Sequence, residues 1–356
     1  LNLHVNTRRK MENIFSREAF VRADAEEVGE TVYFSNVIAQ YIEGMMQTTD
    51  FNVIHEARFR VALYYDVRNF TSFLPVLLSR IGCQIITPEG LEEGRGVKTL
   101  DDFAAGIKAL KSAVMQHQAD MGVLIDQNAD RLVLVDEKGE VITDEQMVNL
   151  ISFLLLKFTR RQAVPVPVAA PRVIEELAHE YDGLVLKAQG AGSGMIVTGV
   201  AENKILFEGD EIPEFQIMCD AITSLVKILE LMGREKLRLS ELVATMPVFY
   251  LDRQEVHCPA EEKASVMRRL LTQFKDDQLE LTDGIKILHE EGWSLVLPDD
   301  EEPLFTVFTE ASSLEKANEI TRKYVSIINQ MRCLGEVSCR LEVRSGYESK
   351  TDVGSA

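Results

Sequence analysis

The sequence MGVLIDQNADRLVLVDEKGEVITDE at residues 121–145 decides the fold of this chain. Its first apolar run stops at Asp126, and its second begins at Leu132. Between the two runs, Asp126, Asn128 and Asp130 carry side-chain oxygens at alternate positions. Because residues i, i+2 and i+4 of an extended segment point the same way, these side chains share one side of a loop. Oxygen ligands on one side of a loop suit a hard divalent cation such as magnesium.

Two other interpretations compete for this loop. Asp and Asn are common in turns, so the segment is also compatible with a polar turn between two strands of a hairpin. Glu137 is the twelfth residue counted from Asp126, as the last ligand of an EF-hand would be. The EF-hand fails because its sixth position requires glycine, where this chain has Arg131, and because the flanking runs predict strands rather than helices.

Composition limits the class of protein. The chain has 356 residues, a length that predicts about two to four domains. Its net charge of −19 argues against nucleic acid and anionic membranes as partners, because an acidic surface repels both. The five cysteines are odd in number and include no C-x-x-C pair, which favours reduced thiols in a cytoplasmic protein. We find no signal peptide and no apolar run long enough to span a membrane.

Hydrophobic periodicity predicts an α/β pattern in the first 250 residues. Residues 8–50 are expected to be mostly helical. A βαβ unit of parallel strands is expected from strand 59–65, helix 73–81 and strand 83–86. Strands 121–125 and 132–135 are expected to form a hairpin. A second strand, helix and strand follow at 164–168, 172–181 and 184–187. A long helix is expected over 215–232, with Gly233 as its cap.

The pattern changes after residue 247. Short strands are expected at 248–250, 284–288, 294–297 and 304–308, with helices at 260–274 and 313–331. Ser312 and Glu315 have the spacing of a capping box for the last helix. These elements predict a smaller α+β domain, followed by a polar tail at 345–356.

The loop at residues 126–131 resembles the metal loop of the phosphoglucomutase/phosphomannomutase superfamily. That loop reads D-x-D-x-D-R, and its aspartates hold magnesium beside a phosphoserine. Asp126, Asp130 and Arg131 match this pattern, whereas Asn128 departs from it. The resemblance implies magnesium on Asp126, Asn128 and Asp130, with weakened affinity because one carboxylate is missing.

The resemblance covers most of the chain and implies a fold. The fold expected is phosphohexomutase-like, with tandem α/β domains, mixed sheets and a C-terminal α+β domain. The implied parts are a helical remnant of the first mutase domain at 1–50, a second mutase-like domain at 51–160 and a third at 161–250. A fourth domain follows at 251–344, and a polar tail at 345–356.

The phosphate-binding loop of the family, R-P-S-G-T-E-P, is altered here. Gly292, Trp293, Pro298, Glu302 and Pro303 fall in register with the family's last domain. Its arginine is replaced by Leu297, and its Ser-Gly-Thr by Asp299, Asp300 and Glu301. A carboxylate about 4 Å from a phosphate charge costs roughly 4 kcal/mol at an effective dielectric constant near 20. We therefore interpret the loop formed by Pro298, Asp299, Asp300 and Glu301 as a solvated acidic turn without a phosphate-binding residue.

The sugar-binding loop of the family, G-E-x-S-G, is also altered. The matching region ILFEGDEIPEF at 205–215 keeps Glu208, Asp210 and Glu211 as acceptors for sugar hydroxyls, but no Ser-Gly follows. A solvated acidic turn is the other interpretation of these three residues. The glycine-rich segment QGAGSG at 189–194 is interpreted as a flexible loop rather than a phosphate cradle, because it lacks the full glycine spacing.

The family transfers phosphate through a serine in a T-A-S-H-N-P-like loop. No Ser-His pair occurs in this sequence, so that loop is expected before Leu1 or is missing. Without a phosphorylated residue, reversible transfer has no covalent carrier. The segments ENIFSREAFVRA, FEGDEIPEF and LPDDEEPLF resemble the mutase-like module at the C-terminus of bacterial mannose-1-phosphate guanylyltransferase-type nucleotidylyltransferases.

Three functions are compatible with this resemblance. The first is a mutase-inactive module of nucleotide-sugar biosynthesis that oligomerises, or that senses a sugar phosphate or nucleotide sugar for a partner nucleotidylyltransferase domain or subunit. The second is an active magnesium-dependent phosphohexomutase that interconverts hexose 1- and 6-phosphates, with Arg131 steering phosphate and its serine outside this chain. The third is a structural scaffold without a ligand.

Overall fold

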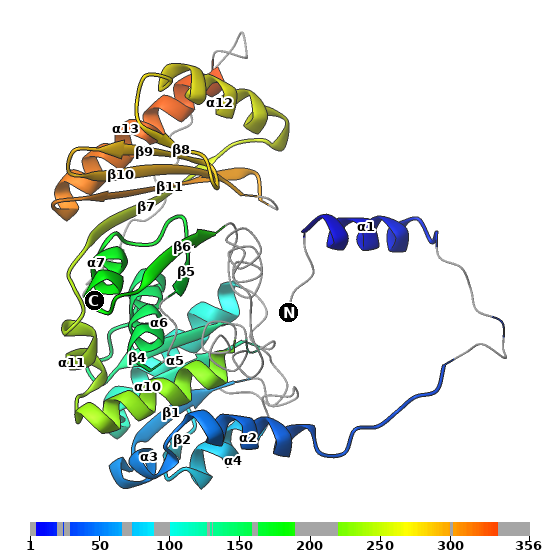
Figure 1. Ribbon diagram of the computed structural model, residues 1–356, viewed down its shortest axis with the longest axis vertical. Coiled ribbons are helices and arrows are strands. Elements are labelled where there is room, and N and C mark those ends of the chain that lie inside the picture. The colour runs from blue at the N-terminus through cyan, green and yellow to red at the C-terminus, as the bar shows by residue number, and fades with distance from the viewer. Residues whose placement is uncertain are drawn as a thin grey trace, which may run out of the picture. The chain divides into compact units, whose positions relative to one another are not determined.

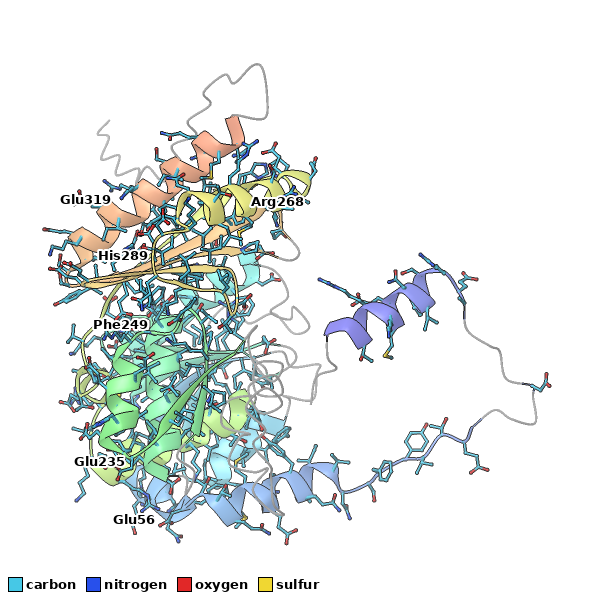
Figure 2. The ribbon with its side chains drawn as sticks, turned by 45° about the horizontal axis from the view of Figure 1, so that its top comes forward. Glu56, Glu235, Phe249, Arg268, His289 and Glu319 are labelled. Atoms are coloured by element: carbon cyan, nitrogen blue, oxygen red, sulfur yellow. The ribbon has the colours of Figure 1, made fainter. Side chains whose placement is uncertain are left out.

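A computed structural model describes residues 5–19, 24, 29–65, 73–88, 100–126, 129, 131–158, 163–188, 220–299 and 302–333. The chain forms two compact units, Leu1–Phe249 and Tyr250–Ala356 (Figure 1). Phe249, the last residue of the first unit, is labelled in Figure 2. The finer division at residues 50 and 160 stays a prediction. Among the described residues, no helix has the length and apolar character needed to cross a membrane.

The first unit is built on a mixed four-stranded sheet with the order β2-β1-β3-β4. Its strands are β1 (Arg60–Tyr64), β2 (Gln84–Ile86), β3 (Met121–Ile125) and β4 (Leu132–Asp136). β1 runs parallel to β2 and to β3, whereas β3 and β4 are antiparallel. The predicted βαβ unit and the predicted hairpin are both confirmed.

Alternation along these strands gives the sheet two buried faces, as the twofold period of a strand requires. Val61, Leu63 and Val123 point into the core that contains α4 (Leu74–Arg80), α6 (Asp144–Phe158) and α10 (Ala221–Glu235). Ala62, Tyr64 and Leu124 point to the other face, which α5 (Leu100–His117) covers. The predicted metal loop therefore follows a strand of a sheet that is packed on both sides.

A second strand–helix–strand unit follows in the first unit. β5 (Ala163–Pro167) and β6 (Leu184–Ala188) are parallel, and α7 (Val173–Glu180) connects them. The core of this part joins α6 to α7 and β5 through side chains that include Leu155, Val164 and Ile174. This arrangement confirms the second predicted unit.

The prediction of a largely helical segment over 8–50 is wrong in its middle. The helices there are α1 (Val5–Ser16) and α2 (Val37–Thr48), and residues 29–34 are not helical. Gly29 and the β-branched and aromatic residues 31–34 have low helix propensity, which explains the break. A short helix, α3 (Phe51–Ala57), then leads into β1.

The bounds predicted for the long helix before residue 250 are also wrong. α10 begins at Ala221, because the carboxylate of Asp220 accepts hydrogen bonds from the backbone N–H groups of Ile222 and Thr223 and caps the helix. Gly233 lies inside the helix, which ends at Glu235 and is followed by Lys236 as a C-cap in a left-handed conformation with φ of 53°. Gly233 is needed for packing, since a Cβ atom there would lie 2.7 Å from Cγ1 of Val53. α11 (Leu239–Ala244) closes the first unit.

The second unit is an antiparallel sheet with two helices. The strand order is β7-β11-β10-β9-β8, with β7 (Tyr250–His257), β8 (Leu279–Glu280), β9 (Ile285–His289), β10 (Gly292–Pro298) and β11 (Leu304–Ala311). α12 (Ala260–Gln273) and α13 (Leu314–Cys333) pack on one face through core residues that include Leu270, Tyr324 and Ile328. Arg268 on α12 and Glu319 on α13 are labelled on this helical side in Figure 2. The predicted α+β architecture is confirmed.

Two predicted details of the second unit are wrong. The strand expected at 248–250 runs from Tyr250 to His257, because its main-chain groups pair with β11 over its whole length although most of its side chains are polar. The cap of α13 is Ser313 rather than Ser312: the Ser313 hydroxyl accepts a hydrogen bond from Lys316 N at 3.3 Å. The Ser312 hydroxyl instead donates to Glu291 at 2.8 Å.

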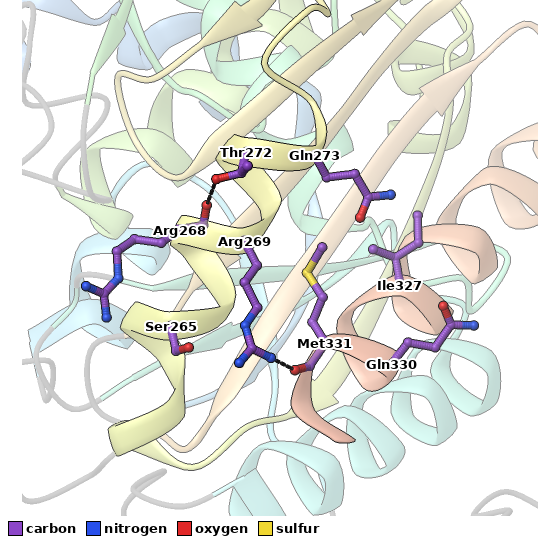
Figure 3. Close-up of a pocket in the computed structure, with 8 residues that line it drawn as sticks. All are labelled: Ser265, Arg268, Arg269, Thr272, Gln273, Ile327, Gln330 and Met331. Carbon is purple, nitrogen blue, oxygen red and sulfur yellow. Dashed lines mark hydrogen bonds between the residues drawn. The ribbon is translucent and has the colours of Figure 1, made fainter. Parts of the chain in front are cut away.

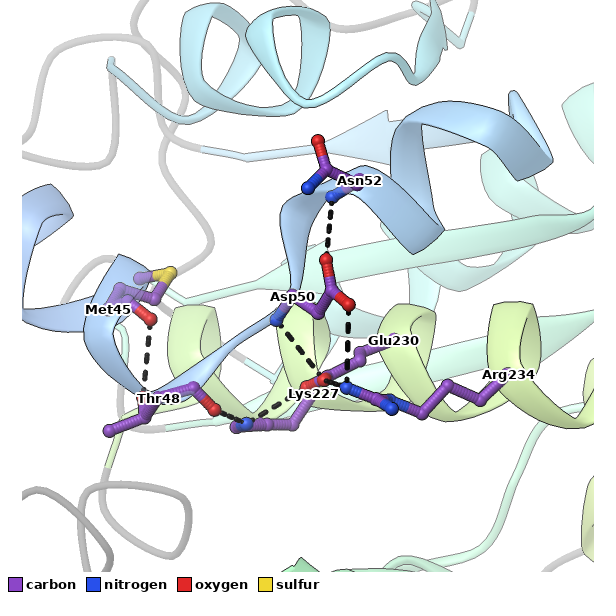
Figure 4. Close-up of polar contacts among 7 residues, drawn as sticks. All are labelled: Met45, Thr48, Asp50, Asn52, Lys227, Glu230 and Arg234. Atoms are coloured by element: carbon purple, nitrogen blue, oxygen red, sulfur yellow. Dashed lines mark hydrogen bonds and ion pairs between the residues drawn. The ribbon is translucent and has the colours of Figure 1, made fainter.

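A buried polar network joins α10 to the turn between α2 and α3 (Figure 4). Lys227 and Glu230 of α10 are 4% and 2% exposed, and Lys227 Nζ lies 2.9 Å from Glu230 Oε2. Lys227 also donates to the carbonyl oxygen of Thr48. Glu230 Oε1 accepts hydrogen bonds from Asp50 N at 3.2 Å and from Arg234 Nη2 at 2.7 Å. Each charge is therefore compensated, as burial requires.

We expect Glu230→Ala to lower the free energy of unfolding by about 3–5 kcal/mol, because it leaves the Lys227 ammonium buried without its carboxylate. Glu235→Ala on the same helix is the matched control: Glu235 pairs with Lys157, and these side chains are 41% and 30% exposed. An exposed pair contributes about 0–1 kcal/mol. Urea denaturation measures both variants, and equal losses would show that the buried network contributes no more than a surface pair.

Candidate metal centre

Asp126 and Arg131 form the base of the predicted metal loop. β3 is buried along its whole length and delivers Asp126 at its end. Asp126 N donates to Arg131 O at 3.3 Å, and Arg131 N donates to Asp126 Oδ1 at 3.0 Å. These contacts confirm a tight hairpin turn. Asn128 and Asp130 lie outside the described residues, so the predicted three-ligand set stays a prediction.

Ala129 anchors the loop from within. Its φ of +54° is left-handed, and its side chain is 4% exposed. Its N–H donates to Asp126 O at 3.2 Å, and its carbonyl oxygen accepts a hydrogen bond from Ala221 N at 2.9 Å. Since Ala129 stands between Asn128 and Asp130 in the sequence, the first turn of α10 holds the backbone between two of the predicted ligands.

Asp220 organises that first turn. Its Oδ1 accepts hydrogen bonds from Ile222 N at 2.9 Å and Thr223 N at 3.3 Å. Its Oδ2 accepts the Thr223 hydroxyl at 2.7 Å and the Tyr41 hydroxyl at 2.5 Å. Burial, and next the Asp220 carboxylate, raise the pKa of Tyr41 far above its ordinary value. The phenol therefore stays protonated and donates to Asp220.

Sequence reasoning missed Asp220 and Tyr41. An Asp before a long apolar run is an N-cap signal, and Asp220 shows it in the sequence. The signal was obscured because apolar residues continue upstream of it. Tyr41 lies on α2 and packs edge-on against Phe73, with ring centroids 5.9 Å apart. Its contact with Asp220 joins residues 179 positions apart and has no local signature.

Arg131 is held by weak surface contacts. Its guanidinium lies 3.6 Å from the carboxylate of Asp144 and stacks 4.7 Å above the centroid of the Phe103 ring. The Arg131 and Asp144 side chains are 49% and 62% exposed, and such a pair contributes about 0–1 kcal/mol. Its predicted role in steering phosphate stays a prediction.

The donor chemistry of the loop fits a hard dication. Asp126, Asn128 and Asp130 would offer two carboxylates and an amide oxygen, which are ligands of magnesium. Among the residues with described placement, no group of three or more His, Cys, Asp or Glu side chains could hold a metal ion. Asn128 and Asp130 lie outside those residues, so this finding does not bear on the predicted triad.

Glu137 takes no part in an EF-hand. Its carboxylate accepts the Ser240 hydroxyl at 2.5 Å and Ser240 N at 3.2 Å. Partial burial raises the pKa of Glu137, but the hydrogen bonds from Ser240 outweigh it, and the pKa lies below its ordinary value. This carboxylate is an ionised structural acceptor that connects β4 to α11.

The acidic loop of the second unit is a hairpin turn in its described part. Asp299 Oδ1 accepts a hydrogen bond from Glu302 N at 2.7 Å, and Pro298 pairs with Phe305 across the hairpin. Lys263 Nζ donates to the carbonyl oxygens of Asp299 and Glu302 at 2.5 Å each. These contacts agree with the interpretation as an acidic turn. Asp300, Glu301, the segment 189–194 and the sugar-loop residues Glu208, Asp210 and Glu211 lie outside the described residues.

We expect Asn128→Asp to tighten magnesium binding roughly tenfold, because it adds a carboxylate to the predicted ligand set. Calorimetric titration with magnesium chloride measures the affinity. Asn318→Asp, which adds the same charge to α13 in the other unit, is the control. Identical affinities for the unchanged chain and both variants would assign the loop to turn chemistry alone.

We expect Tyr41→Phe to speed hydrogen exchange at the Ala221 amide by about tenfold. The variant keeps the ring but loses a hydrogen bond to a charged group, which contributes about 1.5–3 kcal/mol. Tyr181→Phe is the control, since Tyr181 also packs edge-on against a phenylalanine, Phe153, at 6.0 Å between centroids. Unchanged exchange in Tyr41→Phe would show that Asp220 holds the helix start without Tyr41.

No family model matches the chain. Among curated proteins it is similar to the phosphoglucomutase/phosphomannomutase of Thermococcus kodakarensis, with 26% identity over 330 residues that cover 90% of this chain and 71% of that protein. It is 31% identical over 274 residues to a protein of Methanopyrus kandleri described as a probable phosphoglucosamine mutase. That match covers 74% of this chain and 59% of the relative, so the chain corresponds to only part of these proteins.

Solved structures share the fold. A phosphoglucomutase/phosphomannomutase family protein from Burkholderia thailandensis matches with a TM-score of 0.71 and 15% identity, covering 93% of this chain and 71% of that chain. An N-acetylphosphoglucosamine mutase of Aspergillus fumigatus, solved in complex with GlcNAc-6P and magnesium, matches with a TM-score of 0.51 and 11% identity, covering 81% and 69%. At these identities the likeness concerns the fold alone. Together with the curated relatives, it supports the phosphoglucomutase/phosphomannomutase (alpha-D-phosphohexomutase) superfamily as the family of this chain.

Proposed function

We propose that this chain is a phosphohexomutase-like module that senses hexose phosphates through a magnesium loop and does not by itself interconvert them. The single observation that carries the proposal is the acidic turn between β10 and β11. Lys263 donates to two carbonyl oxygens of that turn, those of Asp299 and Glu302. The ammonium group is thus engaged by the turn itself, which lies where the family pattern has its phosphate loop.

Electrostatics make this turn a poor phosphate site. The sequence places four carboxylates in a row at 299–302. One carboxylate about 4 Å from a phosphate charge costs roughly 4 kcal/mol at an effective dielectric constant near 20. A hydrogen bond to a charged group returns only about 1.5–3 kcal/mol. This turn would therefore bind the second phosphate of a hexose bisphosphate poorly, and also that of a bisphosphate intermediate that has turned round in the site.

Group transfer also needs a nucleophile to carry the phosphate. The sequence contains no Ser-His pair that resembles the family's serine loop. A module that lacks a carrier can still bind a sugar phosphate beside magnesium. The residues that would hold the metal are Asp126, Asn128 and Asp130, and the bound ion would supply positive charge to the phosphate oxygens.

The partner we propose is a nucleotidylyltransferase domain or subunit. The supporting observation is the resemblance of residues 12–23, 207–215 and 297–305 to the mutase-like module of guanylyltransferase-type proteins. In this arrangement the module would report sugar-phosphate supply to the enzyme that makes the nucleotide sugar. Self-association of the module is a second contribution that we propose for it.

The second candidate function is active phosphohexomutase chemistry. It is favoured by the names of the curated relatives, which are mutases that share 26% and 31% identity with this chain. In that case the serine would be supplied from outside this sequence. The two candidates differ in one measurable property, the conversion of a hexose 1-phosphate into a 6-phosphate.

The experiment measures turnover and binding on the same 356-residue chain. Glucose 1-phosphate and mannose 1-phosphate are each added with magnesium chloride, the 6-phosphate product is assayed, and thermal unfolding is followed. We expect no product, together with magnesium-dependent stabilisation of about 2.7 kcal/mol at a ligand concentration 100 times the Kd. Asp126→Asn is the control, since the amide oxygen can still accept the Arg131 N–H while the charge is lost.

The outcomes separate the hypotheses. Formation of the 6-phosphate by this chain would overturn the proposal. Since a mutase whose serine lies outside this sequence also predicts no product here, the assay is repeated with a protein that carries the serine-bearing part, where product would replace the proposal by the active mutase. Stabilisation by neither sugar phosphate, with or without magnesium, would leave the ligand-free scaffold. Equal stabilisation of the unchanged chain and Asp126→Asn would show that sugar phosphates bind, but not at this loop.

A further inference from the structure

The face of α12 that looks toward α13 is polar. Its members recur at intervals of three and four residues, the spacing of one helix face: Ser265, Arg268, Arg269, Thr272 and Gln273. Arg268, Thr272 and Gln273 are exposed, so this stripe lies along the open edge of the helix pair and not in its buried contact. The core is served by other residues of the same helix, Val266 and Leu270, which are 1% and 0% exposed.

The polar stripe borders an open groove of about 520 Å³ between α12 and α13 (Figure 3). The facing wall comes from the last turns of α13, with Ile327, Gln330 and Met331. The groove therefore combines two guanidinium groups, two hydroxyls, two carboxamides and two apolar side chains. A volume of several hundred Å³ is within the range of small-molecule sites.

The groove is cationic in a chain of net charge −19. Arg268 and Arg269 line it, and no carboxylate is among its eight lining residues. Glu262, three positions before Ser265, is paired with Arg332 at 3.3 Å. This local charge is opposite in sign to that of the chain as a whole and selects for an anion.

The two guanidinium groups retain donors. Arg268 Nε donates to Ala264 O at 3.3 Å, and Arg269 Nη1 donates to Met331 O. A guanidinium has five N–H donors, so each arginine uses one of them within the described part of the chain. Ser265 lies three and four positions before the arginines, so the three residues start from neighbouring positions on the surface of one helix. Forked guanidinium donors and a hydroxyl suit the oxygens of a phosphate group.

The other side of the groove suits an organic group. Ile327 and Met331 offer apolar surface, and the carboxamides of Gln273 and Gln330 can donate to and accept from hydroxyls. We infer that the groove between α12 and α13 binds a phosphate monoester, with the phosphate on Ser265, Arg268 and Arg269 and the hydroxylated organic part toward α13. This site belongs to the second unit and is independent of the magnesium loop in the first.

Sugar phosphates and nucleotides share this chemistry, so both are tested. Glucose 6-phosphate, GMP and inorganic phosphate are titrated calorimetrically into the full chain in the presence of EDTA. We expect at least one ester to bind, and to bind more tightly than inorganic phosphate. Arg268→Gln should weaken that ester at least about tenfold, as loss of a charged hydrogen bond does. The ester whose binding shows this loss identifies the source of the ligand.

Matched variants make the test specific. Arg322→Gln removes the same charge from an exposed position of α13 that does not line the groove, and it should leave the affinity unchanged. Asp126→Asn should also leave it unchanged, which separates this site from the proposed sensing site. Arg268→Lys keeps the positive charge but loses the forked N–H donors of the guanidinium group. Thermal unfolding verifies that each variant is folded. Absence of binding by both esters, or equal weakening by Arg268→Gln and Arg322→Gln, would overturn the inference.

Discussion

The structure of the first unit depends on a helix that is buried along almost its whole length. The side chains at positions 221–232 of α10 are all buried, and they include Thr223, Ser224, Lys227 and Glu230. A buried polar or charged group costs several kcal/mol unless it is paired. The N-cap Asp220 and two charged residues of α10 therefore fix neighbouring elements: Asp220 accepts a hydrogen bond from Tyr41 of α2, Lys227 donates to Thr48 at the end of α2, and Glu230 accepts one from Asp50 N before α3. Close packing adds to this, because Gly233 lets α3 approach through Val53.

The position of the candidate metal centre depends on this helix. β3 delivers Asp126 from a fully buried strand, and the first turn of α10 holds Ala129 at the far side of the loop. The loop is thus held at two points: its first residue, Asp126, continues the chain of β3, and Ala129 is hydrogen-bonded to Ala221 of α10. In the second unit the acidic turn is equally well held, but by contacts that occupy its backbone carbonyls. The two loops thus differ in their contacts: Ala129 is fixed by α10, whereas the backbone carbonyls of Asp299 and Glu302 accept hydrogen bonds from Lys263.

Local patterns in the sequence predict the sheet of the first unit because its strands are short, apolar and bounded by polar turns. The hairpin of β3 and β4 and the parallel pairing of β1 with β2 follow from such patterns. The bounds of α10 and β7 do not, since they depend on partners far along the chain: Asp220 caps a helix that apolar residues precede, and the polar strand β7 is fixed by pairing with β11. For the same reason the metal-loop pattern predicts Asp126 and Arg131 from local sequence alone, whereas the contact of Tyr41 with Asp220 joins distant segments and has no local signature.

Ala129 links the loop and the helix thermodynamically. A non-glycine residue in the left-handed region costs about 1 kcal/mol or more, and here it is retained beside the hydrogen bond from Ala221. Two segments that restrain each other in this way are coupled, and such coupling is reciprocal for binding free energies. A ligand that held Asp126 and Ala129 in place would also steady the first turn of α10, and through Tyr41 it would restrain α2. Conversely, a partner that bound α2 would alter the affinity for any such ligand by the same factor, without touching the loop.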